Sequence, residues 1–278
     1  MAIDLGPLWD FDRPELSEQR FQAALATVGG DDALILKTQI ARSWGLRQDF
    51  ARARVLLREI EVAALAAGPE VQVRWWLEWG RTHASAAHPK PPSTASASHL
   101  SDQATARRAW QHALGLARQA RLDGLAVDAI HMFAFVDTEP ADQLRWATEA
   151  LAVVEQSDQP AARRWEPSIR NNLGYALHQL GRHADALVQF ERAVALRQRM
   201  DNPEALRVAW WMVAWTQRSL GRYAEALAIQ LKLERESQAA GQPDPHVFSE
   251  LEALYRAMGD EARARHYADR LKPPASSP

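Results

Sequence analysis

The sequence predicts an all-α protein built from repeated helical hairpins, and three observations lead to this prediction. Apolar residues recur with the 3.6-residue period of amphipathic helices along most of the 278 residues. A frame Ala-x-Ala returns at intervals of roughly 40 residues, a spacing typical of helical repeats. Its first alanines are Ala51, Ala104, Ala184, Ala224 and Ala262, and a weaker copy stands at Ala141. In the last three full copies a glycine precedes the alanine by three residues, where it can end one helix before the next begins.

The N-terminal part, residues 1–33, is expected to hold one helix ahead of the repeats. Pro14 to Leu25 has apolar residues at helical spacing, with Pro14 in the first turn and Asp12 as a candidate N-cap. We expect this helix to cover the first repeat.

The clearest hairpin spans residues 167–200, PSIRNNLGYALHQLGRHADALVQFERAVALRQRM. Three residues lie on one side of each of its helices: Leu173, Gly174 and Leu177 on the first, and Ala186, Phe190 and Ala193 on the second. Small residues at a helix crossing allow close approach, and the bulky Phe190 fills the space beside them. This pattern resembles a tetratricopeptide repeat, and the chain resembles bacterial proteins composed only of such repeats.

Carrying this frame outward gives six units, at 34–67, 73–118, 124–157, 167–200, 207–240 and 245–272. The resemblance implies that they form a right-handed α-solenoid over residues 34–272. Trp76 and Trp210 stand in the family's tryptophan position. His131 and Glu252 occupy positions where the family prefers Gly or Ala, so we expect their units to pack differently or further apart.

Two segments lack the apolar content needed to pack. Residues 88–100 (HPKPPSTASASHL) interrupt the second unit and are rich in Pro, Ser and Ala, so we expect a mobile loop there. We also expect residues 273–278 to be a disordered tail.

Composition removes several classes of function. The 33 Lys+Arg residues nearly balance 35 Asp+Glu, so no overall charge draws the chain to nucleic acid or to an anionic membrane. The absence of cysteine excludes disulfides, thiolate metal sites and cysteine nucleophiles. No run of residues approaches the roughly 18 apolar positions of a membrane span, and Met1 to Asp10 does not resemble a leader. We therefore expect a cytoplasmic protein.

The motifs of common catalytic and cofactor sites are also missing. There is no His-Glu-x-x-His, no G-x-S-x-G, and no phosphate-binding or dinucleotide-type glycine motif. His178 and His183 are five residues apart and do not share a helix face for a metal. We expect no enzymatic activity, no cofactor and no metal.

The resemblance implies that one face of each first helix lines a concave groove that holds an extended peptide or a partner helix. Helical spacing separates this face from the packing face. It assigns ten candidate ligand-binding residues to the groove: Arg81, Asp128, Met132, Phe135, Asn171, Tyr175, His178, Trp211, Trp215 and Arg218. Leu77 lies on the same face, and Arg42 and Arg256 lie at the two ends of the groove. An aromatic centre with basic ends predicts a partner with apolar anchors and some acidic character.

The family's chaperone-tail binding subset uses a clamp of Lys, Asn and Arg at set groove positions. The equivalent positions here are Thr38, Leu77, Asp128, Asn171 and Trp211, and none is a lysine. The sequence therefore does not predict that subset's ligand.

Three alternatives remain open. Trp211 and Trp215 can pack against a neighbouring repeat, since the spacing of roughly 40 residues leaves the rotation of their helix undetermined. Phe135, Tyr175, Trp211 and Trp215 can also enclose an aromatic pocket of a small-molecule or signal sensor. An enzyme would need an acid/base pair beside such a pocket, for which Asp128 and His178 are the available groups. Seven of the eleven tryptophans are expected in packing positions: Trp44, Trp75, Trp76, Trp79, Trp110, Trp146 and Trp210.

Overall fold

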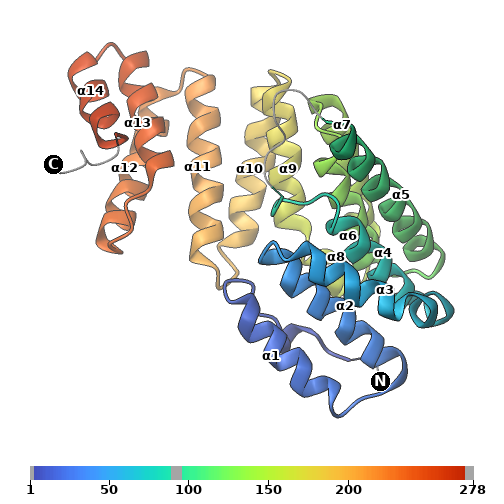
Figure 1. The fold of residues 1–278 in the computed structure, drawn as a ribbon. Helices are drawn as coiled ribbons and strands as arrows, with labels where there is room; N and C mark the ends of the chain where they lie inside the picture. The colour runs from blue at the N-terminus through green and yellow to red at the C-terminus, as the bar shows by residue number, and fades with distance from the viewer. Residues whose placement is uncertain (1–2, 89–95, 273–278) are drawn as a thin grey trace. The chain divides into compact units, whose positions relative to one another are not determined.

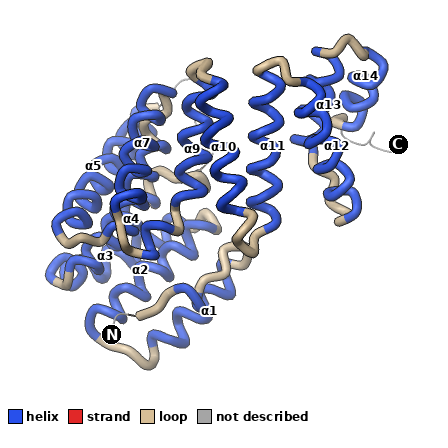
Figure 2. The backbone as a smooth tube through the Cα atoms, turned by 180° about the vertical axis from the view of Figure 1, so that it is seen from behind, coloured by secondary structure: helices blue, strands red, loops and turns tan. Residues whose placement is uncertain are grey.

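The computed structural model describes residues 3–88 and 96–272, and within these ranges the only regular secondary structure is helical (Figure 2). This confirms the all-α prediction. Two compact units divide the chain, Met1–Trp165 and Glu166–Pro278, where the sequence suggests one continuous array.

The first unit consists of an N-terminal helix followed by three helical hairpins (Figure 1). Its helices are α1 (Pro14–Leu25), α2 (Gly30–Leu46), α3 (Phe50–Ala66), α4 (Pro69–Arg81), α5 (Ala97–Gln119), α6 (Asp123–Met132), α7 (Pro140–Gln156) and the short α8 (Pro160–Arg163), with 3-10 turns at Gly6–Leu8 and Phe133–Phe135. The pairs α2–α3, α4–α5 and α6–α7 fall on the first three sequence units. The first helices of successive hairpins also touch, α2 against α4 and α4 against α6.

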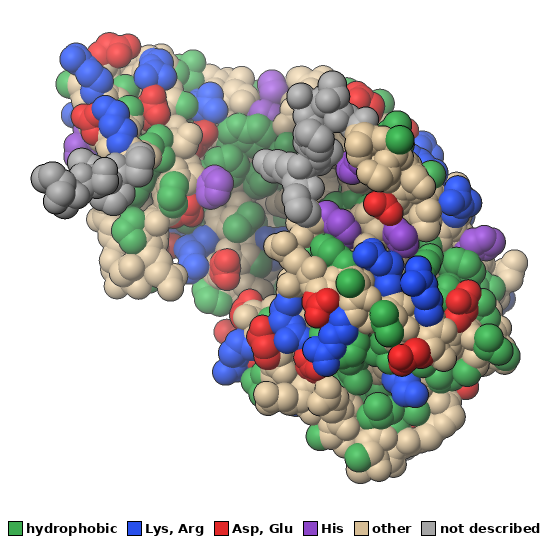
Figure 3. Space-filling model, viewed as in Figure 1, with side chains coloured by type: hydrophobic (Ala, Val, Ile, Leu, Met, Phe, Trp, Pro, Cys, Tyr) green, Lys and Arg blue, Asp and Glu red, His purple; other side chains and the backbone are tan. Residues whose placement is uncertain are grey.

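The second unit consists of three further hairpins: α9 (Glu166–Gln179) with α10 (His183–Arg197), α11 (Pro203–Ser219) with α12 (Tyr223–Ala239), and α13 (Pro245–Ala257) with α14 (Glu261–Arg270). Successive hairpins pack through α10 against α11 and through α12 against α13. Positive and negative side chains are interspersed over α13 and α14 on the face that Figure 3 shows at upper left.

One turn geometry recurs in all three hairpins of the second unit. Gly181, Gly221 and Gly259 have φ angles of 73°, 74° and 79°, a left-handed conformation that residues with a Cβ adopt only with strain. In the first of these turns Gly181 N donates to His178 O and Arg182 N donates to Leu177 O at 2.9 Å, which satisfies carbonyls left open at the end of α9. The glycines that mark the repeats in the sequence are therefore helix stops.

Glycines also permit close helix crossings. A Cβ added at Gly174 would lie 2.7 Å from the Phe190 ring, and one at Gly80 would lie 2.2 Å from the Trp110 indole nitrogen. Both large rings are fully buried. A small residue on the first helix of a hairpin thus faces a large ring on the second.

The N-terminal helix α1 has the predicted bounds and packs on α2, with Phe21 fully buried in the core of the first hairpin. The prediction of Asp12 as its N-cap is wrong, because the N-cap residue is Arg13 and no side chain caps the helix. Instead Asp10 accepts a hydrogen bond from Arg13 N at 3.0 Å, and Asp10 O accepts one from Ser17 Oγ at 2.9 Å. These bonds hold the turn that leads into α1.

The predicted loop at 88–100 falls partly on residues 89–95, which lie outside the described residues. Its last part is helical, because α5 begins at Ala97 and Ser96 Oγ caps it by accepting from His99 N. The predicted tail, 273–278, also lies outside the described residues.

The seven tryptophans expected in packing positions are all at least partly buried. Trp44, Trp75 and Trp110 belong to the buried core. Trp76 and Trp79 pack against the core of the first hairpin. Trp210 packs against the core formed by the last two hairpins, and Trp146 stacks on Phe133.

Candidate functional site

Four of the predicted groove residues form a continuous stack in the second unit, which we call the aromatic row: Tyr175 and His178 on α9, with Trp211 and Trp215 on α11. Trp215 lies at its centre. Its ring stacks on His178 at a centroid distance of 3.4 Å, on Trp211 at 5.8 Å and on Tyr175 at 6.0 Å. Tyr175 is 39% exposed and both tryptophans are partly exposed. The row therefore presents aromatic surface to solvent.

The local sequence explains the row. Tyr175 follows Asn171 by four residues and precedes His178 by three, so all three side chains lie on one face of α9, while Leu173 and Leu177 on the other face are buried. On α11, Val213 and Ala214 are buried and turn Trp211 and Trp215 outward. Asn171 is half-buried, and its Oδ1 accepts no hydrogen bond from the described residues.

His178 is the most enclosed member of the aromatic row. It is 9% exposed, and its Nε2 lies 3.0 Å from Ser219 Oγ. Burial lowers its pKa to about 4, and the nearby charges of His183 and Arg218 act in the same direction. The ring is therefore uncharged at neutral pH and stacks on Trp215 as a neutral group.

Arg218 follows the row on α11, but its charge is already neutralised. Its Nε and Nη2 donate to the two carboxylate oxygens of Glu250 on α13, at 2.5 and 3.1 Å. Burial raises the pKa of Glu250, and the adjacent guanidinium opposes this shift. Arg256 likewise pairs with Glu252, at 2.7 Å. Arg218 is therefore not left to attract an acidic partner, whereas the Arg256 side chain is 58% exposed.

Three predicted groove residues of the first unit, Arg42, Arg81 and Asp128, form a different kind of site. Together with Glu78, which was not predicted, they make a buried charged cluster. Arg81 donates to both carboxylates, and Arg42 lies 3.8 Å from Glu78 and 3.9 Å from Asp128. The two carboxylates are 2% and 5% exposed.

The cluster balances two positive against two negative charges. Burial alone would raise the pKa of Asp128, but the charges of Arg81 and Arg42 hold it below its ordinary value. Asp128 is therefore ionised and paired, which makes it a poor general acid or base. Leu77 is almost fully buried rather than available.

Met132 and Phe135 lie beside this cluster. Together with Arg81 and Ser85 they line a pocket of about 170 Å³. Met132 is 6% exposed, and its sulfur accepts a hydrogen bond from Arg81 Nε at 3.2 Å. The structure thus gathers the ten predicted residues into two groups, one in each unit.

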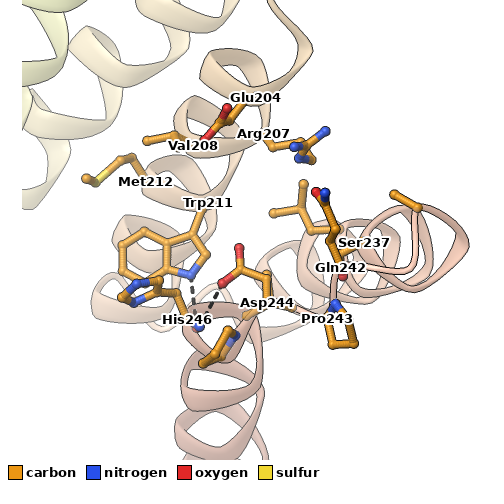
Figure 4. Close-up of a pocket in the computed structure, with 14 residues that line it drawn as sticks. Glu204, Arg207, Val208, Trp211, Met212, Ser237, Gln242, Pro243, Asp244 and His246 are labelled. Atoms are coloured by element: carbon orange, nitrogen blue, oxygen red, sulfur yellow. Dashed lines mark hydrogen bonds between the residues drawn. The ribbon is translucent and has the colours of Figure 1, made fainter. Parts of the chain in front are cut away.

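Sequence reasoning missed a larger pocket of about 590 Å³ in the second unit, lined by residues of α11, the end of α12 and the segment that leads into α13 (Figure 4). Only Trp211 among its lining residues was a candidate. The division of helices into two faces does not detect such a pocket, because Gln242 to Asp244 belong to no helix.

Among the described residues no group of His, Cys, Asp or Glu is arranged to hold a metal ion. Within the same ranges, no helix has the length and apolar character needed to cross a membrane.

Comparisons with known proteins identify the repeats. A family model for the tetratricopeptide repeat matches residues 165–234, a stretch that includes α9 to α11 and most of α12. No curated protein sequence matches the chain. This match shows tetratricopeptide repeats within residues 165–234.

Several solved structures share the fold at low sequence identity. A signal transduction ATPase with numerous domains from Pyrococcus horikoshii, which has a tetratricopeptide-repeat sensor, is similar at a TM-score of 0.67 and 12% identity, over 93% of this chain. The chain spans only 38% of that protein. PilW, a type IV pilus biogenesis factor, is similar at a TM-score of 0.60 and 17% sequence identity. The match covers 86% of this chain and 91% of the PilW chain. A Rap protein complexed with competence and sporulation factor is similar at a TM-score of 0.58 and 13% sequence identity. The match covers 94% of this chain and 71% of the Rap chain.

Proposed function

We propose that the protein is a binding module whose second unit holds a peptide or a partner helix on the aromatic row. The observation that carries the proposal is the stack of Tyr175, His178, Trp211 and Trp215, which is aligned by two helices and open to solvent. Large grouped aromatic surfaces on a soluble protein commonly mark interaction sites.

The arrangement also suits tight binding. The rings are fixed against one another, so little side-chain freedom is lost when a partner covers them. Trp and Tyr are frequent among the residues that dominate interface energies, at about 2 kcal/mol or more each. The Rap structure provides a precedent for this fold, since that protein was solved with a bound factor.

Apolar anchors, rather than acidic groups, are the partner feature that the described contacts favour. The arginines that suggested an acidic partner are engaged: Arg218 by Glu250, and Arg42 and Arg81 by Glu78 and Asp128. An exposed ion pair of a rim arginine with a ligand contributes about 0 to 1 kcal/mol, and an arginine that already has a carboxylate contributes less.

A selected peptide tests the proposal. A phage-displayed library of random peptides is selected on the full chain, and the enriched peptide is synthesised and measured by fluorescence anisotropy. Trp215→Ala removes the centre of the aromatic row and is expected to weaken binding at least about tenfold, equivalent to about 1.4 kcal/mol.

The matched control is Val188→Ala, a truncation of a 45% exposed residue on α10, outside the row. It is expected to leave the affinity unchanged. Equal affinity of folded Trp215→Ala and wild-type protein would contradict the proposal, and so would a library that yields no binding peptide.

A further inference from the structure

The 590 Å³ pocket beside Trp211, which we call the Asp244 pocket after a carboxylate that lines it, has a chemistry of its own. Its apolar part comes from Val208, Trp211 and Met212 on α11 and from the buried side chains of Leu233 and Val247. A volume of this size is typical of pockets that accept a small molecule or a large side chain.

The orientation of Trp211 determines what it can offer. Its indole Nε1 donates to His246 O at 3.1 Å (Figure 4), so the only polar atom of the ring is already used. One face of the ring stacks on Trp215. What remains for a ligand is the opposite face, which is electron-rich and attracts cations.

Asp244 supplies a negative charge in the same pocket. Its Oδ1 accepts a hydrogen bond from His246 N at 2.8 Å and so caps α13. Figure 4 shows its other carboxylate oxygen directed into the pocket, and no described residue donates to that oxygen. Because the cap fixes the side chain, the free oxygen is held in place before any ligand arrives.

The charge balance of the pocket also favours a positively charged ligand. Two carboxylates, Glu204 and Asp244, line it against one guanidinium, Arg207. The positive end of the α13 dipole offsets about half a charge, which leaves a negative balance.

We propose that this pocket binds an apolar group that ends in a single positive charge, with the cation between the Asp244 carboxylate and the face of Trp211. The apolar part of the ligand lies against Val208, Met212 and Leu233. The same chemistry occurs in a lysine or arginine side chain of a peptide and in a free organic amine. The pocket shares Trp211 with the aromatic row, but Asp244, which supplies the negative charge, has no part in the row.

Three probes with similar carbon frameworks test the sign of the charge: 2-phenylethylamine, 2-phenylethanol and 3-phenylpropanoate. Each is titrated into the full chain, and binding is followed by calorimetry and by the tryptophan indole N–H signals in NMR spectra. The amine is expected to bind at least about fivefold more tightly than the alcohol and the acid, in line with a cation–π contact plus one ion pair.

Two matched variants locate the effect. Asp244→Asn keeps an oxygen to cap α13 but removes the charge, and it is expected to reduce amine affinity to that of the alcohol. Asp260→Asn makes the same change at the N-cap of α14, where Asp260 accepts from Arg263 N at 3.0 Å, and it is expected to change nothing.

A further comparison identifies the source of the cation. An acetylated, amidated pentapeptide with a central lysine is set against the same peptide with norleucine. Preference for the lysine peptide assigns the pocket to peptide side chains, and binding of the free amine alone assigns it to small amines. The proposal is overturned if the acid binds as tightly as the amine, if Asp244→Asn leaves the amine affinity unchanged, or if no probe binds at about 10 mM.

Discussion

At the scale of single residues, the environment of His178 shows how the aromatic row depends on a neutral ring. Its imidazole stacks on Trp215 and contacts Ser219, and burial lowers its pKa to about 4 from an ordinary value of 6.5. A protonated ring would carry its charge into this enclosed position beside Arg218. The stack is thus coupled to pH through one residue.

This coupling predicts a loss of stability in acid. Well above pH 6.5 the ring is neutral in the folded and the unfolded chain, and its contribution to folding is fully present. As the pH falls from 6.5 toward 4, the unfolded chain binds a proton that the folded chain excludes, so stability decreases over this window. Chemical unfolding at pH 7 and pH 4.5 is expected to show that the free energy of unfolding falls more for wild type than for His178→Gln. Equal losses would show that His178 is not the group responsible.

At the scale of secondary-structure elements, the charged cluster joins three helices of the first unit. Arg42 comes from α2, Glu78 and Arg81 from α4, and Asp128 from α6. These are the first helices of successive hairpins, and their predicted ligand face is filled here by their own ion pairs. The cluster therefore contributes to the register between hairpins rather than to a free binding surface.

Removal of one charge is expected to destabilise this unit strongly. Asp128→Asn leaves two buried guanidinium groups with one carboxylate, and breaking a buried pair in this way costs about 3 to 5 kcal/mol. The control is Asp142→Asn on α7, whose partner Arg145 lies 2.8 Å away on the exposed surface, with an expected cost of about 0 to 1 kcal/mol. Denaturant titration followed by circular dichroism measures both. Similar costs for the two variants would show that the cluster is not a stabilising unit.

The elements also show which features the sequence can predict. The hairpins follow from local signals, because Gly181, Gly221 and Gly259 end helices and Gly174 faces Phe190 within one 34-residue unit. The pairing of Arg81 with Asp128 joins residues 47 positions apart, and it depends on how one helix is rotated against another. Spacing within a helix contains no information about that rotation. The Asp244 pocket was missed for a related reason, since several of its residues belong to no helix face.

At the scale of the whole molecule, the division at residue 165 separates two kinds of site. The first unit holds the charged cluster, and the second unit holds the aromatic row and the Asp244 pocket. The second unit also has a core of its own, which includes Leu233, Phe248, Leu251, Tyr255 and Tyr267. Repeat arrays gain stability from individual hairpins and their immediate neighbours.

This organisation predicts that the second unit folds when it is produced alone. A fragment of residues 166–278 is expected to give a helical circular dichroism spectrum with a cooperative melting transition, and to bind the selected peptide as the full chain does. The matched fragment 203–278 lacks α9 and therefore Tyr175 and His178, and it is expected to lose peptide binding. An unfolded 166–278 fragment would show that its core needs residues before 166.

The near-identical turns at Gly181, Gly221 and Gly259 have a consequence for how this protein can change over evolutionary time. Because each hairpin of the second unit closes through the same backbone geometry, duplication or exchange of a hairpin leaves the turn intact. The outward residues of α9, α11 and α13 are then free to vary without cost to the turn. Binding specificity in such a chain can diversify one hairpin at a time, while the scaffold that presents it stays constant.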